Sequence, residues 1–197
     1  MNSKTGYLDL EAYLGGAFLH PGGVDTTRVL LDRLHLAPGL RVLEIGCGVG
    51  ATTALAVRSG AQVVALDRRG AMLTATRARL QAAGQSCGTL VQADASRLLP
   101  FASASFDAVY AESVLALLPI ETVIQECARV LRPGGRLALT ERIWRSDVAA
   151  ATVEQVNSLS PTDFGIPAAT AAPLDYRAWV SRLEQAGFEQ VEAIPVD

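Results

Sequence analysis

Short apolar runs alternate with amphipathic stretches along most of the chain. Six of these runs are predicted to be β-strands, at residues 41–45, 62–66, 89–92, 106–111, 136–143 and 188–194. Between them, apolar residues that recur every three or four positions predict helices over residues 24–36, 51–60, 71–83, 119–131 and 174–186. We expect Asp25 or Thr26 to cap the first helix, and Gly60, Gly84 and Gly187 to end later ones.

This alternation of strand and helix predicts an α/β protein. We expect a Rossmann-like, doubly wound and mostly parallel sheet with helices on both faces and right-handed crossovers. The strands are continuous apolar runs, as expected where both faces are covered. Residues 145–172 break the pattern, because they contain Pro161, Gly165, Pro167 and many small residues. We expect this segment to form a loop or lid over a ligand site.

The turn after the first strand is rich in glycine. It contains Gly46, Gly48 and Gly50 and leads directly into the helix that begins at Ala51. Glycine lacks a Cβ atom, so a ligand can come close to the main chain there. The first N–H groups of the following helix point back into the turn. Strand, glycine turn and helix together predict a nucleotide-binding site.

The glycine turn by itself leaves the type of nucleotide open. Gly46, Gly48 and Ala51 satisfy the looser dinucleotide pattern, and Asp67 stands where a nicotinamide enzyme places its ribose carboxylate. Glu44 argues against a dinucleotide, because a carboxylate is repelled by a pyrophosphate. A ligand that carries a sulfonium and an ammonium group would tolerate or prefer that acid.

Five motifs in a fixed order narrow the choice. They are LEIGCGVG (43–50), ALD (65–67), QADASRLLPF (92–101), FDAVYA (106–111) and RVLRPGG (129–135). Over roughly residues 20–143 the chain therefore resembles the class I S-adenosylmethionine-dependent methyltransferases, in particular the small-molecule branch with ubiquinone, sterol and glycine-type enzymes. The segment His20-Pro21-Gly22-Gly23 with Thr27 is similar to small bacterial members of this branch.

The resemblance implies an activity and a cofactor. The activity is transfer of a methyl group from S-adenosylmethionine to a small-molecule acceptor by in-line displacement, which leaves S-adenosylhomocysteine. Glu44 and the loop residues Gly46, Cys47 and Gly48 would face the methionine part of the cofactor. Glu112, directly after the fourth strand, would lie near the methionine end and the transferable methyl group.

The resemblance also implies contacts to the adenosine part of the cofactor. Asp67 would hold both ribose hydroxyls, and Arg68 would border the adenine. Asp94 would accept a hydrogen bond from the adenine amino group, and Ala95 would offer its backbone N–H.

A catalytic residue is harder to identify. Many relatives carry a histidine shortly after the fourth strand, where this chain has only apolar residues at 114–118. That departure favours an apolar acceptor pocket and leaves His20 and Glu112 as candidates, with Glu141 and Asp163 behind them. A base is needed only where the acceptor is a protonated oxygen or nitrogen.

Four aromatic residues are candidates for the acceptor pocket. They stand near the N-terminus or in and beside the expected lid, where aromatic rings line an acceptor or pack as a cover: Tyr7, Tyr13, Trp144 and Phe164.

The end of the chain departs from the family pattern. Family members usually have a seventh, antiparallel strand beside the sixth, whereas this sequence ends directly after the expected sixth strand. The alternatives are a six-stranded sheet with an unusual edge, a truncated chain, or a homodimer in which a partner chain covers that edge.

Composition excludes several other classes. A net charge of −3 with scattered arginines gives no electrostatic reason to expect nucleic acid as a partner. The longest apolar run, residues 114–120, is too short to span a bilayer, and residues 1–6 contain no apolar signal core. We therefore expect a cytoplasmic protein with no membrane partner. Cys47, Cys87 and Cys127 are widely spaced, so we expect reduced cysteines and no metal site.

The interpretation that combines these observations is a single methyltransferase domain. Residues 1–36 would form an N-terminal cap and helix, 40–143 the cofactor-binding core, 145–172 the lid or substrate loop, and 173–197 the last helix and strand. Two alternatives stay open: a non-catalytic S-adenosylmethionine-binding module, and an NAD(P)-dependent oxidoreductase.

Overall fold

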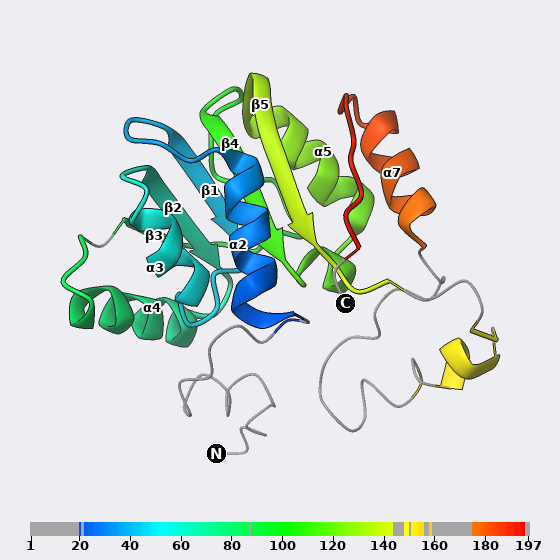
Figure 1. Cartoon of the computed structure of the whole chain (residues 1–197), viewed down its shortest axis with the longest axis horizontal. Coiled ribbons are helices and arrows are strands. Elements are labelled where there is room, and N and C mark those ends of the chain that lie inside the picture. The colour runs from blue at the N-terminus through cyan, green and yellow to red at the C-terminus, as the bar shows by residue number, and fades with distance from the viewer. Residues whose placement is uncertain are drawn as a thin grey trace.

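A five-stranded parallel sheet forms the centre of the protein (Figure 1). The structure, a computed structural model, describes residues 20, 22–86, 88–143, 148–149, 151–155, 158 and 175–195. The strand order is β3-β2-β1-β4-β5, and every pairing is parallel. The strands are β1 (Arg41–Ile45), β2 (Gln62–Asp67), β3 (Thr89–Gln92), β4 (Phe106–Glu112) and β5 (Leu131–Thr140).

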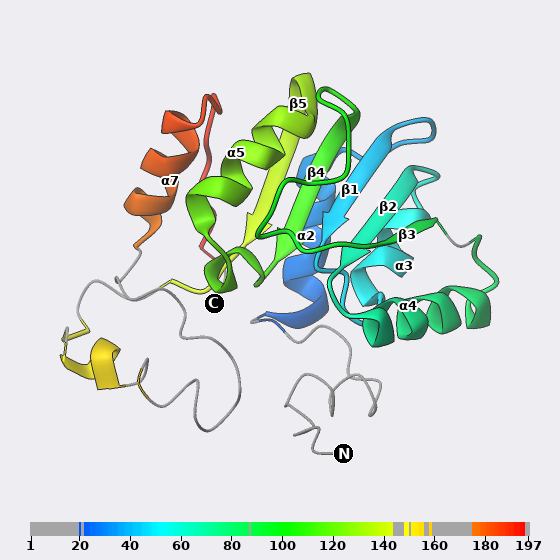
Figure 2. The same ribbon diagram turned by 180° about the vertical axis from the view of Figure 1, so that it is seen from behind.

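Helices cover both faces of the sheet, which confirms the predicted doubly wound α/β fold. On one face lie α2 (Gly23–Leu34), α3 (Ala51–Val57) and α4 (Gly70–Ala82). Figure 2, the view from behind, shows α5 (Ile120–Val130) and α7 (Tyr176–Gln185) on the other face. A short 3-10 helix, η1 (Leu115–Leu117), connects β4 to α5.

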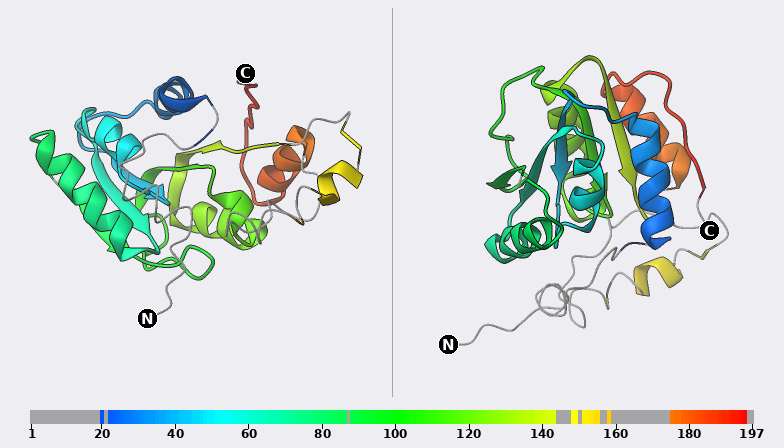
Figure 3. Two further views of the ribbon diagram at one scale, coloured as in Figure 1. Left: turned by 90° about the horizontal axis from the view of Figure 1, so that it is seen from below. Right: turned by 60° about the vertical axis from the view of Figure 1, so that its left-hand side comes forward.

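Side chains that alternate along each strand divide the core into two layers. In β1, Val42 packs with Tyr110 of β4 and with Leu30 and Leu34 of α2. Leu43, the next residue of β1, points to the opposite side and belongs to the larger cluster that includes the apolar side of α5. The left view in Figure 3 shows the two helical layers on either side of the sheet. Because β1 is central and covered on both faces, the glycine loop that follows it starts from a rigid support.

β5 is longer than predicted, because it begins before the Pro-Gly-Gly sequence rather than after it. The pairing with β4 runs from Phe106 opposite Leu131 to Ala108 opposite Arg136, so two steps along β4 correspond to five along β5. Pro133 and Gly134 thus lie in a bulge inside the strand, where a tight turn ahead of the strand had been expected. Residues 141–143, which the sequence places in this strand, lie beyond the end of β5.

The predicted sixth strand is wrong. Residues 188–195 are described by the structure and form no strand. Only Phe188 and Val191 are partly buried, and Gln190 has a φ of 55°, which is incompatible with extended backbone. Glu192 instead forms an ion pair with Arg33 of α2, with 2.7 Å between Arg33 Nη1 and Glu192 Oε2. This segment therefore runs over the surface, and the sheet has five strands in the described part of the chain.

Smaller differences concern helix ends. α2 begins at Gly23, one residue earlier than predicted. Its N-cap residue is therefore Gly22, and no side chain caps the helix. Asp25 consequently lies in the first turn, where it pairs with Arg28. α7 begins at Tyr176, and Asp175 caps it by accepting a hydrogen bond from the backbone N–H of Ala178.

Most of the expected lid, residues 145–172, lies outside the described residues, but residues 151–155 within it are helical. None of the helices in the described part of the chain has the length and apolar character needed to cross a membrane.

Candidate functional site

The loop after β1 is fixed by hydrogen bonds from neighbouring elements. The carbonyl oxygen of Leu66, in β2, accepts from the backbone N–H groups of Gly46 and Cys47, at 2.7 and 3.0 Å. Thr76 of α4 donates its hydroxyl to the carbonyl oxygen of Gly48 at 2.9 Å. These bonds hold the loop at the carboxyl edge of the sheet, which is where ligands bind in folds of this type.

Two glycines of this loop have different surroundings. A Cβ atom added to Gly50 would lie 2.9 Å from the Cα atom of Thr76, so no side chain fits there. A Cβ atom added to Gly48 would meet nothing within 4 Å, although its φ of 52° is also left-handed. The open side of the loop is therefore at Gly48, where a bound nucleoside could contact the main chain.

Asp67, the last residue of β2, is oriented by this loop. It is 8% exposed, and its Oδ2 atom accepts from the backbone N–H of Gly48 at 3.0 Å. Its Oδ1 atom accepts from the backbone N–H of Arg69 at 2.9 Å. Burial raises the pKa of Asp67, and these two backbone donors oppose that rise. The carboxyl group thus has a fixed position directly beside the open side of the glycine loop.

Glu44, in β1, is more deeply buried than Asp67. It is 4% exposed and accepts a hydrogen bond from the hydroxyl of Thr53 in α3 at 2.5 Å. Burial raises the pKa of Glu44 to about 8, and the negative charges of Glu112 and Asp67 add to the rise. Three acids from β1, β2 and β4 therefore interact around the glycine loop. A pKa of about 8 leaves Glu44 mostly protonated at neutral pH, so the negative charge that disfavours an anion here comes from Asp67 and Glu112.

Glu112, at the end of β4, is the centre of a buried polar cluster. Its Oε1 atom accepts from the Thr27 hydroxyl at 2.9 Å, and its Oε2 atom accepts from the Thr52 hydroxyl at 2.5 Å. His20 Nε2 lies 3.3 Å from Glu112 Oε1 and 3.0 Å from Thr27 Oγ1. Thr27 has one hydroxyl hydrogen and gives it to Glu112, so it accepts from His20, which therefore carries a proton on Nε2.

This cluster, defined as His20, Thr27, Thr52 and Glu112, joins three separate parts of the chain at the carboxyl edge. His20 precedes α2, Thr27 belongs to α2, and Thr52 lies in the first turn of α3. The His20 and Glu112 side chains are only 6% and 8% exposed. Because Nε2 carries its proton toward this cluster, Nδ1 is the imidazole nitrogen that could take a proton from a bound acceptor.

Of the residues expected to contact adenine, Asp94 and Ala95 lie after β3, and Arg68 directly follows β2. The Oδ1 atom of Asp94 accepts from both the backbone N–H and the hydroxyl of Ser96, at 2.9 and 2.7 Å. Those bonds lower the pKa of Asp94. Ala95 is buried, whereas the Arg68 side chain is exposed and its carbonyl oxygen accepts from Gln92.

The remaining candidates for catalysis or for the acceptor pocket are Glu141, Asp163 and four aromatic residues. Glu141 accepts from the backbone N–H groups of Val114 and Leu115, at 3.1 and 2.7 Å, and so caps the start of η1. Asp163 and the four aromatic candidates for the acceptor pocket lie outside the described residues: Tyr7, Tyr13, Trp144 and Phe164.

Sequence reasoning missed the polar partners of the buried acids. Thr52 and Thr53 were not identified as site residues, and Thr27 was noted only as part of a similarity. Two adjacent threonines in the first turn of the helix after a glycine loop were the available signal. Their hydroxyls are directed at Glu112 and Glu44, on neighbouring strands.

A parallel strand, a glycine loop and a helix, with acids at the ends of three adjacent strands, define a nucleoside-binding α/β site. Residues 43–139 match the methyltransferase domain family. The chain is 34% identical over 184 residues to methyltransferase GfsG of Streptomyces halstedii, a match that covers 90% of this chain and 63% of the relative. It is 31% identical over 185 residues to an uncharacterized protein of Haemophilus influenzae, covering 92% of this chain and 71% of that protein.

A solved structure has the same fold. Phosphoethanolamine N-methyltransferase 2 of Haemonchus contortus, in complex with S-adenosyl-L-methionine, superposes with a TM-score of 0.75 at 21% identity. The superposition covers 97% of this chain and 44% of that one. The chain belongs to the class I S-adenosylmethionine-dependent methyltransferases, which confirms the resemblance seen in its motifs and the cofactor expected from them.

Proposed function

We propose that the protein transfers the methyl group of S-adenosylmethionine to a small-molecule acceptor. The observation that carries the proposal is the group of three buried acids around the glycine loop, Glu44, Asp67 and Glu112. The cofactor is a sulfonium with an ammonium group, so it suits a site in which the carboxylates of Asp67 and Glu112 would repel a pyrophosphate. Family membership supports the same choice and argues against a nicotinamide oxidoreductase.

The residues at the carboxyl edge fit the parts of this cofactor. Gly48 would present its main chain to the methionine part, with Glu112 near the reactive end. Asp67 would hold the ribose hydroxyls, because its carboxyl group is fixed beside the loop. Asp94 and Ala95 would contact the adenine. When bound, the cofactor supplies an activated methyl group, and the protein contributes alignment and exclusion of water.

The cluster of His20, Thr27, Thr52 and Glu112 supports an acceptor that must lose a proton. His20 would act as the base, and Glu112 and Thr27 would orient its ring. Such an acceptor presents a hydroxyl or a protonated nitrogen. Similar proteins include a phosphoethanolamine N-methyltransferase of Arabidopsis thaliana and an O-methyltransferase of Aspergillus sclerotiorum, and their names support a small-molecule acceptor.

Calorimetric titration tests the cofactor. We expect S-adenosylmethionine and S-adenosylhomocysteine to bind and NAD to give no heat of binding. Binding of NAD with no response to the other two would overturn the proposal. Methyl transfer is then measured with labelled cofactor against a library of small hydroxyl and amine compounds. Cofactor binding without transfer to any of them would favour a non-catalytic binding module.

Two histidine variants test the base. We expect His20→Ala to lower turnover at least about a hundredfold, since general bases typically contribute a factor of 10²–10⁴. Its affinity for S-adenosylhomocysteine should stay within a few-fold of the parent. His35→Ala is the matched control, because His35 is exposed at the opposite end of α2. Unchanged turnover in His20→Ala would exclude His20 as the base.

A further inference from the structure

The loop between β3 and β4 has no strand partner in the described structure. It spans residues 93–105, between Gln92 and Phe106, and carries the two residues assigned to the adenine, Asp94 and Ala95. Backbone N–H and C=O groups that are buried in a loop need hydrogen-bond partners from elsewhere. The partners of this loop therefore determine how firmly the adenine side of the site is held.

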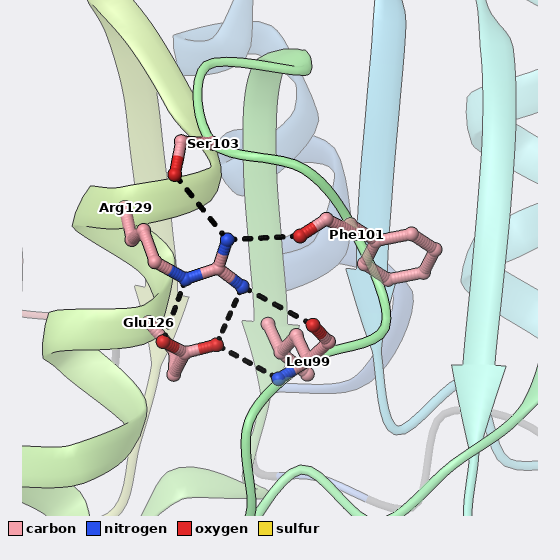
Figure 4. Close-up of polar contacts among 5 residues, drawn as sticks. All are labelled: Leu99, Phe101, Ser103, Glu126 and Arg129. Carbon is pink, nitrogen blue, oxygen red and sulfur yellow. Dashed lines mark hydrogen bonds and ion pairs between the residues drawn. The ribbon is translucent and has the colours of Figure 1, made fainter.

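A pair of side chains on α5 supplies these partners (Figure 4). Arg129 and Glu126 form two parallel hydrogen bonds, Nε to Oε1 at 2.8 Å and Nη2 to Oε2 at 2.7 Å. The backbone N–H of Leu99 donates to Glu126 Oε2 at 2.7 Å, and Arg129 Nη2 donates to the Leu99 carbonyl oxygen at 3.1 Å. Arg129 Nη1 donates to the Phe101 carbonyl oxygen at 2.8 Å.

The Arg129–Glu126 ion pair thus supplies the hydrogen bonds that a neighbouring strand would otherwise make to this loop. Glu126 acts as the carbonyl acceptor and Arg129 as the N–H donor that a neighbouring strand would offer to Leu99. The hydrogen bonds from Arg129 lower the pKa of Glu126, so the acceptor is ionised at neutral pH. Charge-assisted hydrogen bonds of this kind are shorter and stronger than neutral ones.

Packing transmits this restraint to the adenine side of the loop. Leu99 is 1% exposed and belongs to the same core cluster as Ala95 and Ile124 of α5. Two residues beyond Leu99, the Phe101 ring packs edge-on against Phe106, with ring centres 5.0 Å apart. At the start of the loop, the backbone N–H of Ala93 donates to the Asp67 carbonyl oxygen at 3.2 Å. Residues 94–96 are therefore fixed from both sides.

We propose that Arg129 and Glu126 are positioning residues that hold Asp94 and Ala95 in the geometry that recognises adenine. This inference rests on the proposed function, because it assumes that the loop borders the adenine of S-adenosylmethionine. Neither side chain contacts the cofactor in this assignment. They act through the backbone of Leu99 and the buried side of the loop.

The test compares two ligands that differ at the adenine. S-inosylhomocysteine has a carbonyl oxygen where S-adenosylhomocysteine has the amino group, and its N1 carries a hydrogen. The donor assigned to Asp94 is therefore replaced by an acceptor. We expect the wild-type protein to prefer S-adenosylhomocysteine by at least about tenfold in Kd, as for a good hydrogen bond to a charged group. Arg129→Lys should lose most of that preference, because an ammonium group cannot reproduce the planar fork of hydrogen bonds.

A general loss of stability would not give this result, because it would lower the affinity for both ligands alike or leave both affinities unchanged. Glu126→Gln is the second variant; it keeps the size of the side chain and removes its charge, and it should show the same loss of preference. Arg182→Lys is the matched control, because Arg182 forms an ion pair with Glu121 of α5, at 2.9 Å, outside this loop. Its preference should equal that of the wild type.

The outcomes separate the two proposals. Wild-type protein that binds neither ligand contradicts the proposed function and the positioning role that depends on it. Wild-type protein that binds both ligands equally refutes adenine recognition by Asp94, and with it the positioning role alone. A normal preference in both Arg129→Lys and Glu126→Gln also overturns the positioning role and leaves the methyltransferase proposal intact.

Discussion

Alanine at Gly48 and alanine at Gly50 perturb the same loop in different ways. Both glycines have left-handed backbone, with φ of 52° and 77°. The Cβ atom of Gly48→Ala would extend into open space, whereas that of Gly50→Ala would lie 2.6 Å from the Thr76 Cγ2 atom and 2.9 Å from its Cα atom. The first substitution should therefore impair ligand binding, and the second should impair folding.

The magnitudes follow from these contacts. Left-handed backbone costs a non-glycine residue about 1–2 kcal/mol, so Gly48→Ala should lower Tm by about 2–8 °C in a domain of this size. Gly50→Ala has the same backbone strain and an overpacking term of about 1–3 kcal/mol, since the Thr76 main chain must move. Together these predict a decrease of about 4–20 °C.

Thermal unfolding and calorimetry distinguish the two effects. We expect Gly48→Ala to raise the Kd for S-adenosylhomocysteine at least about tenfold, which is about 1.4 kcal/mol, because the added methyl group occupies the space of the ligand. Its Tm should stay above that of Gly50→Ala. If Gly48→Ala binds the ligand as tightly as the wild type, the open side of the loop does not face the cofactor and the site is wrongly placed.

Two further predictions concern buried titratable groups. Because the pKa of Glu44 is raised from 4.5 to about 8, its contribution to stability is fully present below pH 4.5 and is lost as pH rises to about 8. Urea unfolding of the ligand-free protein between pH 5 and 9 should show this decline, and Glu44→Gln should flatten it; equal slopes in both proteins would contradict the assignment. Burial also raises the thiol pKa of Cys47, and that of Cys127 to about 12. Peptide mapping after brief treatment with iodoacetamide should find both unmodified in the native protein and alkylated in urea, whereas rapid native labelling of Cys47 would refute its burial.

The central strands could be predicted because their signal is local. β1 and β3 have the predicted bounds, and β2 and β4 extend one residue beyond them. Each is a short apolar run in a chain whose helices and turns are clearly marked. The stretch at 188–194 has a comparable apolar content but forms no strand. Strand formation at a sheet edge depends on a partner and on cover for both faces, and a local pattern reports neither.

The three acids of the candidate site were predictable for the same reason, whereas their hydrogen-bond partners were not. Asp67 and Glu112 end their strands and Glu44 is the next-to-last residue of β1, so parallel topology alone brings them to one edge. Thr27 and Thr52 lie 85 and 60 residues from Glu112 in sequence, and nothing in their own surroundings indicates a carboxylate partner. The Arg129–Glu126 pair is local, but its partner Leu99 lies in a distant loop.

The helix before the family-matched region, α2, contributes to the candidate site. The methyltransferase match begins at residue 43, yet His20 and Thr27 precede it and bind the carboxylate of Glu112 inside it. A buried carboxylate is costly unless it is hydrogen-bonded, so α2 and Glu112 stabilise each other's positions. Residues 43–139 alone would leave Glu112 without two of these partners. His20, the proposed base, thus lies outside residues 43–139, which identify the family. We therefore expect the region before residue 43 to determine the choice of acceptor.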